Sequence, residues 1–377
     1  MKNPFFKPLK SVAFILIVGL IVACSNETNN SVVEDREIDV QNLADGLNHP
    51  WGMAFLPDGN LLVTERSGSL RLLDSENNLS DPIPGVPEVF NEGQGGLLDI
   101  VLDPDFENNQ LVYLSFAEPD EDNNASTALG RGTFENNQLN DFTVIFRQEP
   151  KVDGPNHFGG RIVFAPDGTI FLTLGERFKF DPAQDLSNHM GAIVRINPDG
   201  SVPEDNPFIG QDEAAAETWS YGHRNIEAAV IDPNSGMLWV AEMGPKDGDE
   251  LNIPEAGGNY GWPEVSWGEH YDGEDIPDPP TRPEFKDAVM HWTPVISPSG
   301  MEYYTGDLFP EMEGNFLIGG LSSQGIVRVK ADGNEAEEVG RIDLGARIRD
   351  VKQALDGSIY VLTDKSNGSV LRLVPQE

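Results

Sequence analysis

The sequence predicts an all-β fold, a six-bladed β-propeller, and three observations lead to it. The 377 residues include 39 Gly and 28 Pro, a composition that favours many tight turns. No long stretch shows a convincing helical period. A turn of Asp, Asn or Gly followed by a short apolar strand recurs six times, and repeats of roughly 40 to 50 residues are typical of propeller blades.

Each repeat places its turn directly before a strand that is rich in apolar residues. The predicted strands are 60–64, 111–114, 170–173, 237–240, 315–318 and 358–362. A single blade cannot bury both faces of its small sheet, so six blades stacked around an axis bury them against one another. The longest insertions lie between Gly168 and Gly314. We expect these insertions to form the loops of the functional face.

The N-terminus has the order of a secretory signal, with three lysines before an apolar run at 12–23 and then Cys24. The run is too short to span a membrane, which takes about 20 residues. Its ending in Cys24 resembles a bacterial lipoprotein signal, in which the cysteine is lipidated; the alternative is an ordinary signal with a chance cysteine. We expect a lipoprotein-type signal at 1–23, a tether at 24–38 and the propeller at 39–377. Such a protein is anchored to a membrane outside the cytoplasm, in the periplasm or at the cell surface.

The composition excludes several classes of function. With 25 Lys and Arg against 63 Asp and Glu, the net charge is −38, which disfavours nucleic-acid binding through a basic surface. A single cysteine excludes an intramolecular disulfide and a Cys-rich zinc module. The hydrophobic content of 38%, with 6 Trp and 19 Phe, is too high for a disordered acidic chain.

Two residues near the third repeat are candidates for proton transfer. His157 stands in a Gly-rich loop before the third predicted strand, and a histidine with a pKa near ~6.5 is a usable base. Glu176 follows that strand and is able to orient the histidine. The alternative is a histidine in a surface loop. A nearby cluster, Asp185, Asn188 and His189, is better interpreted as a helical turn that tethers its loop.

Arginines later in the chain are candidate anion receptors. Arg224 lies in a string of polar and aromatic residues, and its planar guanidinium matches carboxylates. Arg347 and Arg349 stand two apart and share a face if the segment is a strand. Ion pairing with the many acids of this chain is the alternative for all three.

Acidic and Gly-rich segments at 242–250 and 257–263 suit calcium, which takes 6 to 8 oxygen ligands. Their spacing is not that of an EF-hand loop. The alternative is a solvated acidic loop, with Trp262 filling its core.

Six strings in order resemble the soluble glucose/sorbosone dehydrogenases, which are pyrroloquinoline quinone (PQQ)-dependent aldose sugar dehydrogenases. They are GQGGLL at 93–98, HFGGR at 157–161, AQDL at 183–186, YGHRN at 221–225, GNYGWP at 258–263 and RIRD at 347–350. The resemblance covers nearly the whole chain after the signal. It implies a six-bladed propeller with PQQ over the central channel and Ca²⁺ at the edge of the quinone.

The resemblance also implies an activity and its residues. The activity is oxidation of an aldose at the anomeric carbon to an aldonolactone, with electrons passed to an external acceptor. His157 matches the general base, Glu176 stands beside it, and Arg224 matches a residue that stabilises negative charge. Cofactor contacts correspond to Gln94, Arg224, Asn225, Arg347 and Arg349. Calcium-binding positions correspond to Gly244, Pro245, Asp249, Glu250 and Tyr260.

The chain departs from the family pattern at four places. Glu176 replaces the usual Asp, Met243 replaces a His or Gln, Val295 stands where a hydroxyl residue is common, and the loop 321–325 lacks a lysine that some members place on PQQ. Two other classes of function stay open at this stage. One is a calcium-dependent propeller lactonase or esterase, and the other is a non-catalytic surface propeller that binds sugar.

Overall fold

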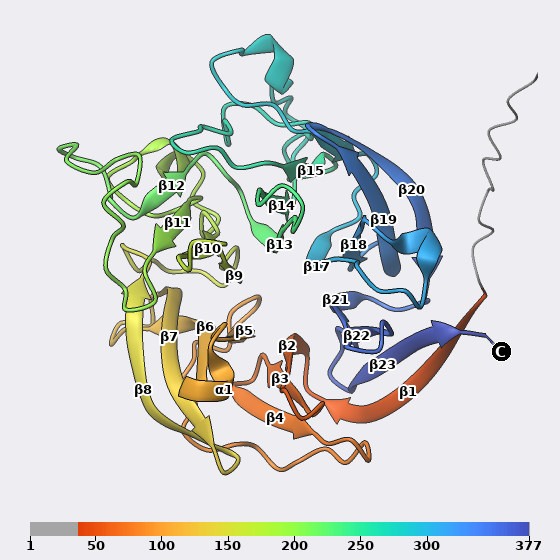
Figure 1. Ribbon diagram of the computed structural model, residues 1–377. Coiled ribbons are helices and arrows are strands. Elements are labelled where there is room, and N and C mark those ends of the chain that lie inside the picture. Colours follow the sequence, from red (N-terminus) through yellow and green to blue (C-terminus); the bar gives the residue numbers. More distant parts are fainter. Residues whose placement is uncertain (1–36, 377) are drawn as a thin grey trace, which may run out of the picture. The chain divides into compact units, whose positions relative to one another are not determined.

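The computed structural model describes residues 37–376, and these form six antiparallel sheets arranged in a ring (Figure 1). The predicted six-bladed β-propeller is confirmed. The predicted signal at 1–23, Cys24 and the tether up to residue 36 lie outside the described residues.

The blades follow one another along the chain, and each sheet takes consecutive strands except the last. The first three blades are β2 (Pro50–Phe55), β3 (Leu61–Glu65) and β4 (Ser69–Leu73); β5 (Leu97–Leu102), β6 (Leu111–Pro119), β7 (Ala125–Glu135) and β8 (Gln138–Arg147); and β9 (Gly159–Phe164), β10 (Ile170–Leu174), β11 (Ile193–Ile196) and β12 (Thr218–Ser220).

The other three blades are β13 (Ile226–Ile231), β14 (Leu238–Glu242), β15 (Asp249–Asn252) and β16 (Met290–Trp292); β17 (Pro298–Tyr303), β18 (Asn315–Gly320), β19 (Gly325–Asp332) and β20 (Glu335–Asp343); and β21 (Ile348–Gln353), β22 (Ile359–Thr363), β23 (Gly368–Pro375) and β1 (Ile38–Leu47). Helical turns are short: α1 (Phe106–Asn109), η1 (Asp181–Gln184), η2 (Pro279–Thr281) and η3 (Pro310–Met312). Within residues 37–376, no helix has the length and apolar character needed to cross a membrane.

The six predicted strands correspond to the second strand of each blade, and local turn chemistry explains why they were recognisable. In the first blade Gly59 has φ +87°, and the Asp58 carboxylate accepts the N–H of Asn60 at 3.0 Å. The third blade repeats this turn with Gly168 at φ +83°. Glycine adopts such angles at low cost, so the Asp-Gly pair marks the hairpin between the first and second strands.

The ring closes by pairing the two ends of the described chain. Strand β1 lies antiparallel to β23, from Ile38 opposite Pro375 to Leu47 opposite Gly368. Leu47 is fully buried and packs in one core cluster with Leu362 of β22. The sequence pattern did not reveal this closing strand.

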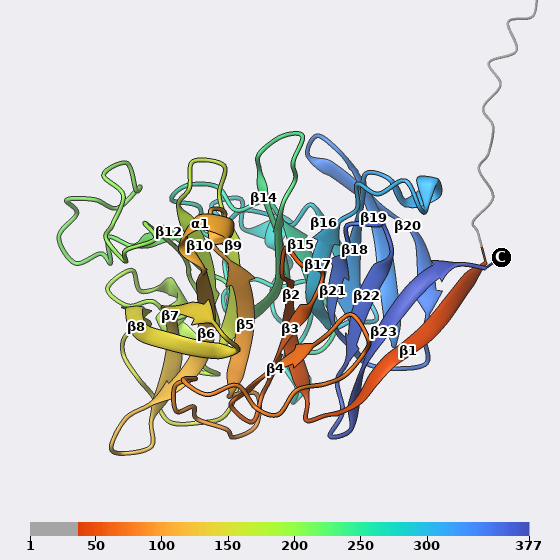
Figure 2. The same ribbon diagram turned by 60° about the horizontal axis from the view of Figure 1, so that its bottom comes forward.

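The inner strands β2, β5, β9, β13, β17 and β21 surround the central channel, and each contacts the next around the ring (Figures 1 and 2). Arg161 on β9 fills this channel and is 3% exposed. Its guanidinium donates hydrogen bonds of 2.7–2.9 Å to carbonyl oxygens of the next three inner strands, those of Glu227, Ser299 and Arg349. Its Nη1 also lies 3.1 Å from the carboxylates of Asp99 on β5 and Asp350 on β21. Its guanidinium carbon lies 4.0 Å from the ring centroid of Trp51 on β2. One side chain on β9 therefore contacts the inner strands of the other five blades.

We expect Arg161→Ala to lower the free energy of unfolding by about 3–5 kcal/mol, because Asp99 and Asp350 would stay buried without their cation. Denaturant unfolding curves give the measurement. The matched control is Arg341→Ala, which removes a half-exposed ion pair with Glu338 and should cost less than ~1 kcal/mol. Equal losses in the two variants would contradict a central role for Arg161.

Candidate active site

Polar side chains gather at one end of the propeller because of strand direction. Residues just before the inner strands and residues at the end of each second strand lie on the same face, since neighbouring strands of a blade are antiparallel. His157, Arg224 and Arg347 precede inner strands. Arg66, Glu176, Glu242 and Asp364 end or follow second strands.

His157 is held from two sides. Its backbone N–H donates to Oε1 of Gln94 at 2.6 Å, and its Nδ1 lies 2.6 Å from Oε1 of Glu176. Glu176 is fully buried and also accepts the backbone N–H of Phe180 at 3.0 Å. The longer side chain of Glu176 thus reaches the imidazole. No residue in the described part of the chain makes a hydrogen bond to Nε2 of His157, so this nitrogen is left for a ligand.

The electrostatics keep this imidazole neutral. Burial lowers the pKa of His157 below its usual value; the Glu176 carboxylate opposes the shift and the charge of Arg224 adds to it. Burial alone would raise the pKa of Glu176, but its hydrogen bond with His157 and that from Phe180 bring it below the usual value. An ionised carboxylate behind a neutral imidazole is the arrangement of a general base and its orienting group.

A second cluster lies at the blade that closes the ring. Arg349 is buried and pairs with Glu227 and, at 2.8 Å, with Asp364. Arg347 is half exposed and lies 3.3 Å from the same Asp364. Burial opposes ionisation of Asp364, yet the nearby cations hold its pKa well below the usual range. Both predicted arginines therefore converge on one carboxylate.

Sequence reasoning missed Arg66, a third arginine of this cluster. Burial lowers the pKa of Arg66. The carboxylates of Asp364 and Glu227 raise this pKa, and the charges of Arg349 and Arg347 lower it, so all four side chains lie close to Arg66. Its position directly after β3 was the available signal, since Glu176 and Asp364 also follow second strands closely.

Arg224 and Asn225 connect the two clusters. Nη1 of Arg224 donates to the carbonyl oxygens of Met243 and Gly244, at 2.9 and 2.6 Å. Asn225 is fully buried; its Oδ1 accepts the N–H of Gly159 and its Nδ2 donates to Glu227. Asn225 thus links the loop of His157 to the partner of Arg349.

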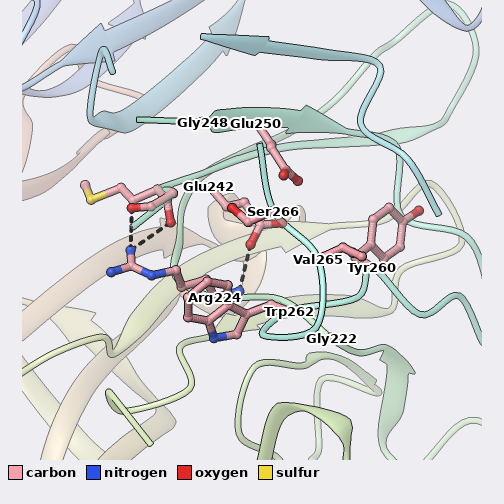
Figure 3. A pocket seen from close by; sticks show the side chains of 11 residues that line it. Gly222, Arg224, Glu242, Gly248, Glu250, Tyr260, Trp262, Val265 and Ser266 are labelled. Carbon is pink, nitrogen blue, oxygen red and sulfur yellow. Dashed lines mark hydrogen bonds between the residues drawn. The ribbon is translucent and has the colours of Figure 1, made fainter. Parts of the chain in front are cut away.

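Arg224 lines a small pocket of about 10 Å³, roughly the volume that holds one water molecule or one metal ion (Figure 3). Its lining includes Glu242 and Glu250 together with Ser266 and several glycines. Glu242 is fixed by Nδ1 of His223 at 2.9 Å; it begins the segment 242–250 that the sequence indicated for calcium, but it was not among the individual positions predicted to bind the ion. Burial, and then the charge of Glu242, raise the pKa of Glu250 to about 8. A buried carboxylate, that of Glu242, and a partly buried one, that of Glu250, repel each other beside a small cavity and suit a cation.

The other predicted metal positions differ in what they offer. Both oxygens of Asp249 accept backbone N–H groups, from Gly244 at 2.9 Å and Ser297 at 2.6 Å, and burial raises its pKa to about 6. The Tyr260 hydroxyl donates to the Ile253 carbonyl at 2.5 Å and points away from Glu242 and Glu250 (Figure 3). These two side chains support the loops, and the assignment of Asp249 and Tyr260 to a calcium site stays a prediction.

The remaining metal predictions involve the backbone. Gly244 lines the cavity, while Pro245 is buried beside it and is not part of the lining. Across residues 37–376, no three His, Cys, Asp or Glu side chains converge on one metal position. A cation here would therefore draw on two carboxylates and on main-chain or hydroxyl oxygens.

The remaining sequence features have local roles. Asn188 donates to the carbonyl oxygens of Pro182 and Asp185, as expected for a turn that tethers its loop. The side chain of Met243 lies 3.9 Å from Nδ2 of Asn225, and the Val295 carbonyl accepts the hydroxyl of Ser322.

Comparison with known proteins gives a consistent result. The family model for glucose/sorbosone dehydrogenase matches residues 47–372. The aldose sugar dehydrogenase YliI of Escherichia coli K12 is 43% identical over 348 residues, which are 90% of this chain and 93% of the relative. The quinoprotein glucose dehydrogenase B of Acinetobacter calcoaceticus is 30% identical over 276 residues, 62% of this chain and 54% of that protein.

Solved structures are also similar. The soluble aldose sugar dehydrogenase from Escherichia coli, in its apo-form, has a TM-score of 0.86 at 42% identity and covers 90% of this chain and 100% of its own. The PQQ-bound aldose sugar dehydrogenase from Streptomyces coelicolor has a TM-score of 0.72 at 29% identity and covers 90% and 99%.

The raised pKa of Glu250 makes stability depend on pH in the metal-free protein. An unfolded glutamate ionises near ~4.3, whereas folded Glu250 holds its proton to about pH 8. The protonated Glu250 therefore adds to the free energy of unfolding in full below pH ~4.3, and this addition is lost as the pH rises through about 8. We expect Glu250→Gln to melt higher than the wild type after chelator treatment, by a margin that grows from pH 5 to pH 9.

Thermal unfolding with and without Ca²⁺ measures this effect. Added Ca²⁺ should raise the melting temperature of the wild type at pH 8 and do little for Glu250→Gln. The exposed Glu274→Gln serves as the control and should show no margin that depends on pH. A margin for Glu250→Gln that stays constant between pH 5 and pH 9 would contradict the assignment.

Proposed function

The chain belongs to the glucose/sorbosone dehydrogenase family, and from this premise we propose that it oxidises aldose sugars at the anomeric carbon, with PQQ and Ca²⁺ as cofactors. The product is an aldonolactone, and electrons pass on to an external acceptor. The observation that carries the proposal is the His157–Glu176 pair next to a cluster of arginines at one end of the propeller. Names of relatives that include glucose and aldose sugar dehydrogenases support the sugar as substrate.

The arginines fit PQQ, which carries three carboxylates. Arg66, Arg224, Arg347 and Arg349 bring positive charge to a chain of net charge −38. The Nε atoms of Arg66, Arg224 and Arg349 are buried and make no hydrogen bond within the described residues. Buried donors without partners favour an anionic guest. We propose that Gln94, Arg224, Asn225, Arg347 and Arg349 hold PQQ, as the family resemblance implies, with Arg66 adding positive charge.

The carboxylates fit calcium. Glu242 and Glu250 line a cavity of the size of one ion, and a bound cation would relieve the repulsion that raises the pKa of Glu250. Gly244, whose carbonyl oxygen accepts Arg224, lies on the same lining. When bound, Ca²⁺ supplies Lewis-acid polarisation.

Different residues of this chain have different roles in the proposed oxidation. Nε2 of neutral His157 takes the proton of the anomeric hydroxyl. Glu176 holds Nδ1 and stabilises the positive charge that the imidazole gains. The chemistry that PQQ supplies when bound is acceptance of the hydride that leaves the anomeric carbon with its electron pair. The positive charge of Arg224 lies close enough to His157 to lower its pKa, and it favours negative charge that develops beside the base.

Purified protein supplied with PQQ and Ca²⁺ should reduce a redox dye in the presence of aldoses. We expect His157→Ala to lower kcat by about 10²–10⁴-fold, the usual contribution of a general base, while the absorbance change on PQQ binding remains. Since burial lowers the pKa of His157, the acid limb of kcat/KM should fall below pH ~6.5, and Glu176→Gln should move it lower still.

The control for this experiment is the exposed His291→Ala, which should keep full activity. Absence of any absorbance change on mixing PQQ with the wild type would overturn the proposal. Lactone hydrolysis with Ca²⁺ alone would replace it with a hydrolase, and sugar binding without turnover would replace it with a binding protein.

We propose in addition that the protein is exported and held to a membrane through lipid on Cys24. The support is the sequence of residues 1–24 alone. Cys24→Ser should shift the protein from the membrane fraction to the soluble extracytoplasmic fraction, and mass spectrometry of the mature N-terminus should show the lipid in the wild type only. An unmodified N-terminus in the wild type would contradict the anchor.

A further inference from the structure

Arg177 is a buried cation without an anionic partner in the described part of the chain. Its side chain is fully buried, and Glu176 and Asp153 act on its pKa only through their charge. Burial lowers this pKa to about 10, so the guanidinium still carries its charge at neutral pH. Arg161 and Arg349 are buried too, but each pairs with two carboxylates. A buried charge is costly unless it is paired, so the contacts of Arg177 call for a physical reason.

The contacts of Arg177 are concentrated on the loop that carries the candidate base. Its Nη2 donates to the carbonyl oxygen of Gly154 at 2.6 Å, and its Nη1 donates to the carbonyl oxygen of Asn156. Its backbone N–H donates to the His157 carbonyl at 3.2 Å, and its guanidinium carbon lies 3.6 Å from the ring centroid of Phe158. Arg177 therefore contacts the loop both before and after His157.

These contacts use the particular geometry of an arginine side chain. The planar guanidinium presents its terminal nitrogens in a rigid fork, and the fork reaches the carbonyls of both Gly154 and Asn156. Its flat face lies over the Phe158 ring, a cation–π contact that is stronger where water is excluded. A lysine has one nitrogen on a flexible stem, so it does not hold the two carbonyls at a fixed spacing.

The segment of Arg177 also holds the group that orients the base. Arg177 directly follows Glu176, whose Oε1 lies 2.6 Å from Nδ1 of His157 and whose carboxylate accepts the backbone N–H of Phe180. A Cβ atom added at Gly175 would lie 2.1 Å from the His157 carbonyl oxygen, so the two backbones are in direct contact. Arg177 thus joins the loop of the base to the loop of its orienting carboxylate.

The backbone is strained on both sides of this junction. His157, Arg177 and Phe178 have φ of 54°, 60° and 59°, a region that non-glycine residues rarely adopt. Such conformations persist where surrounding contacts hold them, and they are found mainly at functional sites. The hydrogen bonds from Arg177 to the loop of His157 are restraints of this kind.

A second link between the same two loops lies in solvent. Nζ of Lys179 is 2.6 Å from Asp153, whose side chain is 85% exposed. Exposed ion pairs of this kind contribute little. The two links join the same segments and differ in burial, which makes Lys179 a matched control for Arg177.

We propose that Arg177 is a positioning residue for the proton-transfer pair, an inference that rests on the proposed role of His157 as the base. Arg177 is fully buried and its terminal nitrogens are taken by carbonyl oxygens, so it acts through its neighbours and not on a ligand. It fixes the backbone around His157, which keeps Nδ1 at Glu176 and leaves Nε2 free for the substrate hydroxyl. A misplacement of about 1 Å in such a group costs about a hundredfold in rate.

NMR of the protein without cofactors tests the placement of the imidazole. Two buried histidines of the described chain bond a glutamate through Nδ1, His157 with Glu176 at 2.6 Å and His223 with Glu242 at 2.9 Å. Each should give a downfield imidazole N–H signal, and His157→Ala identifies the first. Arg177→Met keeps the length of the side chain without its charge or donors. It should lose the His157 signal and retain the His223 signal.

Steady-state kinetics of the holoenzyme give the second readout. Arg177→Met should lower kcat by about 10²-fold, with KM and PQQ affinity within about threefold of the wild type. Arg177→Lys keeps the charge but not the fork, and it should lower kcat by about tenfold with the His223 signal intact. Lys179→Ala removes only the exposed link and should keep both kcat and the His157 signal.

The outcomes separate this proposal from the proposed oxidation. Loss of the His157 signal alone in Arg177→Met supports the positioning role even if PQQ does not bind. An unchanged His157 signal with wild-type kcat would overturn it, and so would an equal loss of kcat in Lys179→Ala. If Arg177→Met loses both histidine signals, it has unfolded and Arg177→Lys decides: a tenfold lower kcat supports the role, and a wild-type kcat overturns it.

Discussion

The position of Arg161 in the central channel is the interaction on which the rest of the structure depends. Its guanidinium contacts the inner strands of the other five blades and lies 3.1 Å from two buried carboxylates, those of Asp99 and Asp350. The inner strands carry His157, Arg224 and Arg347 at their starting ends. An interaction that fixes the distance between these strands therefore also fixes the distance between the proposed base and the proposed cofactor contacts.

Above this channel the site is a network in which each polar group positions the next. Gln94 and Glu176 hold His157, Asn225 joins the His157 loop to Glu227, and Glu227 pairs with Arg349. A network of this kind preorganises charge at the site at no cost during the reaction. In a chain of net charge −38, the network gathers Arg66, Arg347 and Arg349 at one end of the propeller, beside the carboxylates of Glu227 and Asp364.

The loops add a different kind of surface to this rigid base. Insertions from two neighbouring blades bring apolar rings to the edge of a polar site, and one of them does so with a strained backbone. The strand ends therefore supply the polar groups of the candidate site, and the loops supply aromatic rings at its edge.

The sequence by itself determined the features that depend on neighbouring residues. Turns rich in Asp, Asn and Gly marked the second strand of each blade; in two of them Gly59 and Gly168 adopt positive φ and the preceding Asp carboxylates close the turn. Short motifs were enough to single out His157, Glu176, Arg224, Arg347 and Arg349 as candidates. What only the tertiary structure decided are contacts between residues far apart in the chain. These are the pairing of β1 with β23, the meeting of Arg66 with Arg349, the engagement of Asp249 by the backbone, and the contact of Phe180 with Trp262 between two separate loops. The physical reason is that turn chemistry acts over a few residues, whereas burial and ion pairing depend on which distant segments the closed ring brings side by side.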